Sequence, residues 1–232
     1  MEIDLKKSLE ILNFPDKEKK AYQLTLYNVN QTNFYQLKLP ESVTDLILHG
    51  KMTDLIIPEG IKDIYCCNMG LKTVHICESL EFLECCDNDL ETIELTKNLL
   101  CANVRDNKIK TVTCREKLEK LACLDILNNR VTDLDIDFPE ETMVDAYFGG
   151  NENLKIKNIK FIFSNNIHCN FISGDFLSVY DIEHYVYHEH LRYRLYLLAS
   201  LGENYLDVKA VKDDDYFNSI LKRLCPDSWE KY

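Results

Sequence analysis

Long apolar runs are missing from this sequence, which excludes a protein anchored by membrane-spanning helices. No stretch approaches the roughly 18 consecutive apolar residues that such a helix requires. The opening residues, MEIDLKKSLEILNF, place charges among the apolar side chains, so they lack the uninterrupted apolar segment of a secretory signal. We therefore expect an intracellular, cytoplasmic protein that does not enter a membrane.

A block of basic residues is also missing. The chain has 27 Lys and Arg against 39 Asp and Glu, which gives a net charge of −12. Because binding to a phosphate backbone requires a positive face, nucleic acid is not expected as a partner. The acidic balance favours a basic protein surface or peptide as a partner, or else serves solubility alone.

Catalytic signatures are absent as well. The sequence contains no nucleophile elbow, phosphate-binding loop or dinucleotide fingerprint. His184 and His188 have the i, i+4 spacing that can bind a metal, but no metalloprotease glutamate lies between them, so a polar helix face or an interface is favoured. An enzyme would depend on Cys225 and these histidines alone. We therefore expect no catalysis, no metal site and no cofactor.

In place of such signatures the sequence has a repeat. The stretch 80–95, LEFLECCDNDLETIEL, places apolar or small residues at positions 1, 4, 6, 11, 14 and 16, and an asparagine at position 9. The same frame begins again at Ile61 and at Leu99, each 19 residues away. Looser copies begin at Ala21, Val43, Leu121 and Met143, and an eighth strand is expected at 167–169.

The frame has a direct structural meaning. Positions 4 and 6 alternate as in a strand, and regular spacing stacks each strand beside its copy in a parallel sheet. The connection of about a dozen residues leaves little room for a helix, which favours turns or one 3₁₀ turn. At position 9, Asn88, Asn107 and Asn129 are expected to bond the backbone of neighbouring coils as a ladder, which Met69 interrupts toward the N-terminus.

The frame L-x-x-L-x-C-x-x-N-x-L resembles the leucine-rich repeat, and it recurs in register at least five times. The short period, and the Pro-Glu before new frames at 39–42 and 57–60, resemble the short bacterial-type repeats. Together with the bias toward Asn, Lys, Ile and Tyr, the chain is similar to leucine-rich repeat proteins of giant DNA viruses. The resemblance implies a curved α/β solenoid whose concave parallel sheet binds a protein partner.

The predicted fold is therefore an α/β repeat, a leucine-rich-repeat solenoid with a parallel concave sheet and with short turns or 3₁₀ on the convex side. A helical N-terminal cap is expected over 1–20, with an amphipathic helix at 2–13. Residues 21–172 form about 7–8 repeats. A helical C-terminal cap is expected over 173–232, with helices at 178–201 and 214–224.

The concave face is the candidate binding surface, and it is built from positions 3, 5, 7 and 8 of each frame. The candidate partner-binding residues are Asp45, Asp63, Tyr65, Phe82, Glu84, Asp87, Arg105, Asp106, Asp125, Asp145 and Tyr147. Acidic residues around aromatics suit recognition of a basic protein segment. The competing interpretation is the ordinary solvated face of an acidic protein.

A second functional hypothesis is a structural protein that assembles with itself through the C-terminal helices. It depends on four tyrosines of the predicted long helix, Tyr180, Tyr187, Tyr193 and Tyr196.

The ten cysteines are expected to be reduced thiols, because no signal segment directs the chain to an oxidising compartment. Cys66 and Cys85 fall at position 6 and are predicted to point into the core, whereas Cys67 and Cys86 at position 7 point outward. The four sulfurs therefore cannot converge on a tetrahedral zinc ion. Oxidation of Cys67 with Cys86 across adjacent strands stays open.

Overall fold

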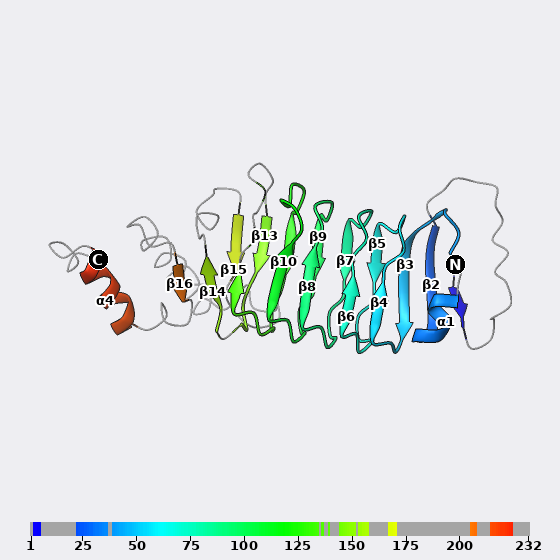
Figure 1. Cartoon of the computed structure of the whole chain (residues 1–232), viewed down its shortest axis with the longest axis horizontal. Helices are drawn as coiled ribbons and strands as arrows, with labels where there is room; N and C mark the ends of the chain where they lie inside the picture. The colour runs from blue at the N-terminus through cyan, green and yellow to red at the C-terminus, as the bar shows by residue number, and fades with distance from the viewer. Residues whose placement is uncertain are drawn as a thin grey trace, which may run out of the picture.

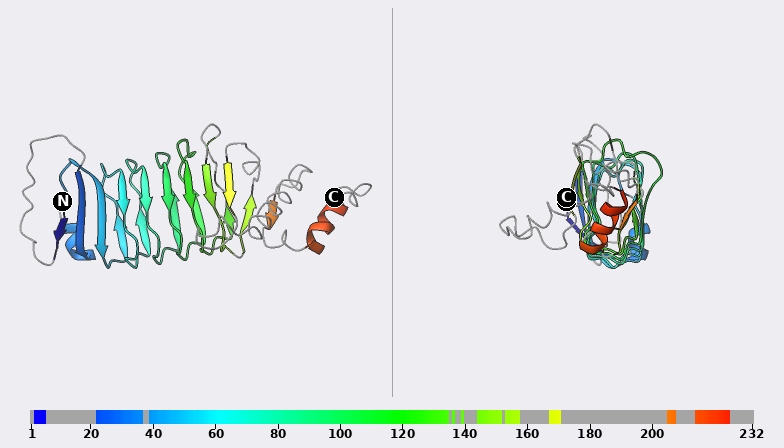
Figure 2. Two further views of the ribbon diagram at one scale, coloured as in Figure 1. Left: turned by 180° about the vertical axis from the view of Figure 1, so that it is seen from behind. Right: turned by 90° about the vertical axis from the view of Figure 1, so that its left-hand side faces the viewer.

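The computed structural model of the protein is an elongated stack of coils along a nearly straight axis, with residues 2–4 toward one end and residues 214–224 toward the other (Figure 1). It describes residues 2–5, 22–36, 39–134, 136, 139, 144–151, 153–157, 167–170, 205–207 and 214–224. Seen along the stack, successive coils superimpose on one closed outline (Figure 2). The molecule is thus a parallel β-solenoid, and its main sheet is flatter than the curved face that the resemblance implies.

One side of the stack is a nine-stranded sheet in which every neighbouring pair of strands is parallel. In spatial order its strands are β1 (Glu2–Asp4), β2 (Tyr22–Val29), β3 (Val43–Gly50), β5 (Asp63–Tyr65), β7 (Phe82–Glu84), β9 (Cys101–Asn103), β11 (Cys123–Asp125), β13 (Val144–Tyr147) and β15 (Ile167–Asn170).

The register of this sheet confirms the repeat frame. Ile64 pairs with Leu83, and Leu83 pairs with Ala102, so each residue at position 4 lies beside its copy in the next coil. The eighth strand expected at 167–169 is present as β15 and pairs with β13.

The opposite side of the stack also consists of strands. A two-stranded sheet is made by β4 (Asp54–Ile56) and β6 (Thr73–His75). A five-stranded sheet follows, with β8 (Thr92–Leu95), β10 (Thr111–Cys114), β12 (Asp133–Leu134), β14 (Lys155–Lys157) and the antiparallel β16 (Tyr205–Asp207).

The prediction of turns or a 3₁₀ turn on this second side was therefore wrong. Positions 13 to 15 of the frame alternate as exposed, inward and exposed, and Leu55, Ile93 and Val112 are the buried middle residues. The residues around them include β-branched threonines, which favour strands. A connection too short for a helix is long enough for a strand of three or four residues.

The core lies between the two sides and is filled by the apolar frame positions. In the coil that begins at Leu80, the inward side chains of Leu83, Cys85, Leu90 and Leu95 are at most 1 % exposed. Burying one such leucine contributes about 1.5–3 kcal/mol relative to leaving it in water. Because every coil adds the same set of side chains, the core runs continuously through the stack.

The predicted asparagine ladder is confirmed. The N–H of Leu90 donates to Oδ1 of Asn107, and that of Ile109 donates to Oδ1 of Asn129. The ladder begins at Asn88, because the equivalent position one coil earlier is the buried Met69. It also continues beyond the predicted members, since Asn151 accepts the N–H of Val131.

The residue before each ladder position turns the chain out of the nine-stranded sheet with a positive φ. This left-handed row consists of Asn28, Asn68, Asp87, Asp106, Asn128 and Gly150, whose φ values lie between 52° and 72°. Asn, Asp and Gly tolerate this conformation better than other residues. In four coils the same residue donates its N–H to the carbonyl one coil further on, as from Asn68 to Cys86.

The ends of the stack differ from the predicted helical caps. Residues 2–4 form the edge strand β1 in place of the start of a helix, since they pair in parallel with residues 25–27 of β2, and the buried Leu5 follows them. A short helix, α1 (Gln31–Gln36), follows β2, and Asn30 accepts the N–H of Asn33 at its start. The helix predicted at 214–224 is present as α4 (Asp214–Leu224), and its Phe217 is buried.

Other parts of the predicted caps lie outside the described residues. These are the remainder of the N-terminal helix and the long helix at 178–201 with its tyrosines and histidines. In the part of the chain that the structure covers, no helix is both long and apolar enough to cross a membrane.

Candidate partner-binding face

The outward side chains of the nine-stranded sheet form one continuous surface, which we call the outer face. Strand register arranges them in rows across the coils, and two rows contain most of the predicted residues. The first row is Asp45, Asp63, Phe82, Cys101, Cys123 and Asp145. The second row is Ile47, Tyr65, Glu84, Asn103, Asp125 and Tyr147.

A third row lies where the chain leaves the strands, two residues after the second. It contains His49, Cys67, Cys86, Arg105 and Leu127, and the left-handed residues Asp87 and Asp106 follow it. All of the predicted partner-binding residues thus lie on the outer face or at the turn that borders it.

Aromatic side chains occupy the N-terminal part of the outer face. The rings of Tyr27 and His49 stack with centroids 5.0 Å apart and planes 13° from parallel. His49 in turn lies 6.1 Å from Tyr65. Tyr65 is 40 % exposed and Phe82 in the next coil is 41 % exposed. The strip offers flat surfaces on which aliphatic or cationic groups can pack.

Tyr27 and His49 were not among the predicted partner-binding residues. Both occupy position 7 of their frames, so the signal was present in the two irregular coils that begin at Ala21 and Val43. An unbroken register from Gln23–Asp45 to Tyr27–His49 places Tyr27 opposite His49, and the register shifts only after this pair, between Tyr27 and Val29.

The central carboxylates of the outer face have raised pKa values, and they become less accessible to water from the exposed Asp63 through the intermediate Glu84 to the buried Asp125. Burial raises the pKa of Asp63, and the neighbouring Asp45 raises it further. Burial also raises the pKa of Asp125, which is 6 % exposed and accepts the N–H of Leu127 at 3.0 Å. Holding such groups ionised in these surroundings costs free energy, which a cation placed beside them would offset.

Glu84 lies between these two carboxylates in the sheet. Burial raises its pKa most, and Asp125 and Asp63 add to the shift. Two contacts oppose it, the hydrogen bond from Nδ2 of Asn103 at 2.8 Å and the charge of Arg105. The raising influences prevail, so the centre of the face favours positive charge.

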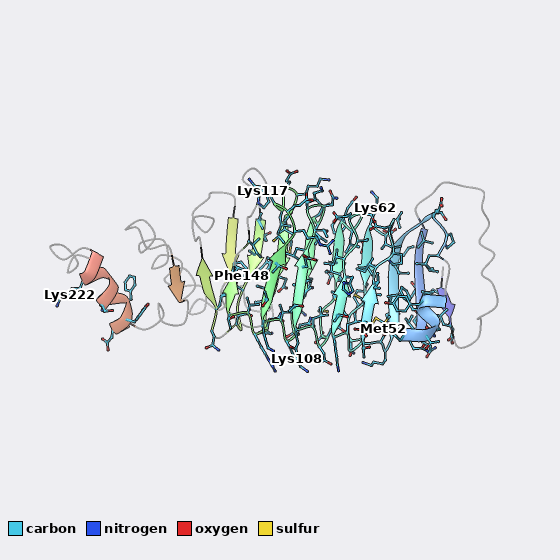
Figure 3. The ribbon with its side chains drawn as sticks, in the orientation of Figure 1. Met52, Lys62, Lys108, Lys117, Phe148 and Lys222 are labelled. Atoms are coloured by element: carbon cyan, nitrogen blue, oxygen red, sulfur yellow. The ribbon has the colours of Figure 1, made fainter. Side chains whose placement is uncertain are left out.

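Among the outward positions that the structure describes on this sheet, Arg105 is the only Lys or Arg. Its Nε lies 3.4 Å from Oδ2 of Asp106 and makes no hydrogen bond. Lys62 and Lys117 lie on one rim of the stack and Lys108 lies on the other (Figure 3). Ion pairs between lysines and glutamates join adjacent coils, as from Lys62 to Glu81 (2.8 Å), from Lys97 to Glu116 (2.8 Å) and from Lys110 to Glu91 (3.1 Å).

Four cysteines also lie on the outer face. The predicted split of the Cys-Cys pairs is confirmed, because Cys66 and Cys85 are 0 % exposed in the core whereas Cys86 is half-buried on the surface. Cys67 points outward beside Cys86, but its side chain is buried, with 8 % of its surface exposed. Within the described residues, no three His, Cys, Asp or Glu side chains are grouped so that they could hold a metal ion.

Comparisons of this chain with protein-family models, with curated proteins and with solved structures find no match. The functional argument therefore depends on the chemistry of the outer face alone. The residues of the enzyme hypothesis, Cys225, His184 and His188, lie outside the described residues.

Proposed function

We propose that this protein is a non-catalytic interaction module that binds a basic protein segment along its outer face. The observation that carries the proposal is the series of carboxylates Asp63, Glu84 and Asp125, which runs from exposed to buried across β5, β7 and β11, has raised pKa values and lies beside exposed aromatic rings. Lysine or arginine side chains laid across this line would relieve the repulsion among the carboxylates.

The partner has a defined shape in this proposal. Successive coils lie about 4.8 Å apart and an extended segment advances about 3.3–3.6 Å per residue, so a segment that crosses the strands meets a new coil about every one to two residues. Its basic side chains would lie over Glu84 and Asp125, and its apolar or cationic groups would pack on Tyr65 and Phe82. The solvated-face interpretation explains the charge but not the withdrawal of carboxylates from water.

The proposal also places the solenoid among the leucine-rich repeats, in the short bacterial-type class, with likeness to those of giant DNA viruses and a cytoplasmic location. The asparagine ladder and the recurring frame support the repeat class. The strands on the second side differ from the turns or 3₁₀ turn that were expected for this repeat class.

A peptide selection tests the binding proposal without assuming the partner. Random peptides displayed on phage are selected on the folded, full chain, and individual winners are then measured by fluorescence anisotropy. We expect enrichment of Lys and Arg, and affinity that falls with added salt. The variant D63N/E84Q/D125N should bind the winners about tenfold more weakly or worse, since each lost charge contact removes about 0.5–1 kcal/mol.

The matched control removes the same charge from elsewhere on the stack. Glu91, Glu94 and Glu116 are exposed carboxylates outside the outer face, and E91Q/E94Q/E116Q changes the net charge equally. Equal weakening by the two triple variants would indicate attraction by net charge alone. Winners without positive charge would contradict the proposed partner chemistry.

A further inference from the structure

Two thiols of the outer face lie almost in bonding distance across neighbouring coils. Cys67 follows β5 and Cys86 follows β7, and their Sγ atoms are 2.6 Å apart. The backbone N–H of Cys86 also donates to Sγ of Cys67 at 3.1 Å. This sulfur separation is only slightly longer than an S–S bond of about 2.05 Å.

The backbone around the pair is already fixed on both sides. Before it, Tyr65 and Glu84 are partners in the parallel register of β5 and β7. After it, the N–H of Asn68 donates to the carbonyl of Cys86 at 3.1 Å. Neighbouring strands lie about 4.8 Å apart, which falls within the Cα separation of about 4.4–6.8 Å that disulfides span. The geometry thus accommodates a bond between the coils without rearrangement of the chain.

We propose that Cys67 and Cys86 form an oxidisable dithiol that a low-molecular-weight disulfide converts into an inter-coil disulfide. The thiolate of Cys86, the more exposed of the two, attacks one sulfur of a reagent such as oxidised glutathione, and one glutathione thiolate leaves. The thiolate of Cys67 then attacks the Cys86 sulfur and displaces the second glutathione. Two protein thiols lose two electrons and two protons, and the reagent's disulfide becomes two thiols.

The same two coils contain a second cysteine pair at which this chemistry is blocked. Cys66 and Cys85 also occupy equivalent frame positions, but both are 0 % exposed within the core. A reagent the size of glutathione has no access to them, so only the outward pair is expected to react. The fold therefore provides an internal comparison of accessible and enclosed thiols at the same coil spacing.

Burial raises the pKa of both outward thiols. Because the thiolate is the nucleophile, the exchange should be slow at neutral pH and should become faster as the pH rises toward 9. This site is suited to slow, stable cross-linking of adjacent coils. The inference does not depend on what the outer face binds.

The test uses the reduced full chain, oxidised glutathione in increasing excess, and rapid alkylation of the remaining thiols. Non-reducing peptide mapping should find the peptide with Cys67 joined to the peptide with Cys86, with the mass of two hydrogens lost. The variant C67S should lose this link and retain a glutathione adduct on Cys86, because the second step is removed. The variant C66A/C85A should retain the link.

Two results would overturn the proposal. One is a link between the two peptides that survives in C67S/C86S, which would place the disulfide in the core pair. The other is a glutathione adduct on Cys86 that persists in the unmutated chain. Circular dichroism of each variant confirms that the fold is intact, so that neither result can arise from unfolding.

Discussion

The side chain of Asn107 satisfies the backbone N–H of Leu90 in the preceding coil, with 3.0 Å between Oδ1 and the amide nitrogen. The same side chain donates through Nδ2 to the carbonyls of Cys85, Val104 and Arg105. These carbonyls have further donors in Asn88, Asn129 and Asp87, respectively. The N–H of Leu90 therefore depends on Asn107 more than the carbonyls do.

Replacing Asn107 by alanine should destabilise the solenoid by about 3 kcal/mol, since it leaves the buried N–H of Leu90 without an acceptor and opens a small cavity. The control is Asn98→Ala, which removes a more exposed amide bonded to the carbonyl of Glu78 and should cost less than about 1 kcal/mol. Urea unfolding followed by circular dichroism measures both. Equal losses would mean that the ladder position contributes no more than a surface amide.

The left-handed residue before the ladder makes a separate prediction. Asp87 has φ 53°, and a β-branched side chain is strained in this region. We expect Asp87→Val to destabilise the fold by about 1–2 kcal/mol, whereas Asp87→Gly should be nearly neutral. Thermal unfolding of the two variants shows whether the turn requires the left-handed backbone conformation or the carboxylate of Asp87. If glycine is as harmful as valine, the carboxylate itself is what the turn requires.

The repeat frame allowed much of this fold to be predicted, because the same pattern recurs in several coils. A departure from the pattern in one copy therefore does not obscure the frame. The inward split of Cys66 from Cys67 and the ladder role of Asn88 followed from position alone. Asn151 escaped notice because it lies within the stretch 149–154, GGNENL, which reads as an insertion into the frame. The pattern is therefore least informative where the spacing changes.

Other features depend on contacts that spacing does not encode. The strands on the second side form because short segments with alternating exposed and inward residues stack on one another from coil to coil. The length of the connection shows only that a helix does not fit, and it does not predict this stacking. Residues 2–4 read as the start of an amphipathic helix but pair with β2, since an exposed sheet edge offers hydrogen bonds that local propensity ignores. The burial of Asp125, which is 6 % exposed between its register partners Asn103 and Tyr147, is likewise not encoded in the spacing.

The second outward thiol pair should differ in reactivity from one member to the other. Cys101 and Cys123 are register partners in β9 and β11, and a hydrogen bond from the Cys123 thiol lowers the pKa of Cys101. Timed alkylation with iodoacetamide, read by mass spectrometry, should modify Cys101 first. In Cys123→Ala the pH midpoint of Cys101 alkylation should rise, and in Cys123→Ser it should rise less because the hydroxyl still donates. An unchanged midpoint in the alanine variant would contradict the hydrogen bond.

Asp125 provides a prediction about stability and pH. Its folded pKa is raised by burial, so the folded state keeps the proton to a higher pH than the unfolded chain, whose aspartates titrate near about 3.9. The resulting stabilisation is present below the unfolded pKa and is lost as the pH rises through the folded pKa. At neutral pH the charged Asp125 therefore weakens the fold.

Asp125→Asn should consequently raise the free energy of unfolding at pH 7, because the amide oxygen can still accept the N–H of Leu127. This advantage should shrink as the pH falls through the raised folded pKa of Asp125, because the wild-type carboxyl then takes up a proton. Glu91→Gln is the control of opposite sign, since Lys110 lowers the pKa of Glu91 and the variant should be less stable at pH 7. Urea unfolding at several pH values measures both differences. A less stable Asp125→Asn at pH 7 would show that the carboxylate's hydrogen bond outweighs its loss of hydration.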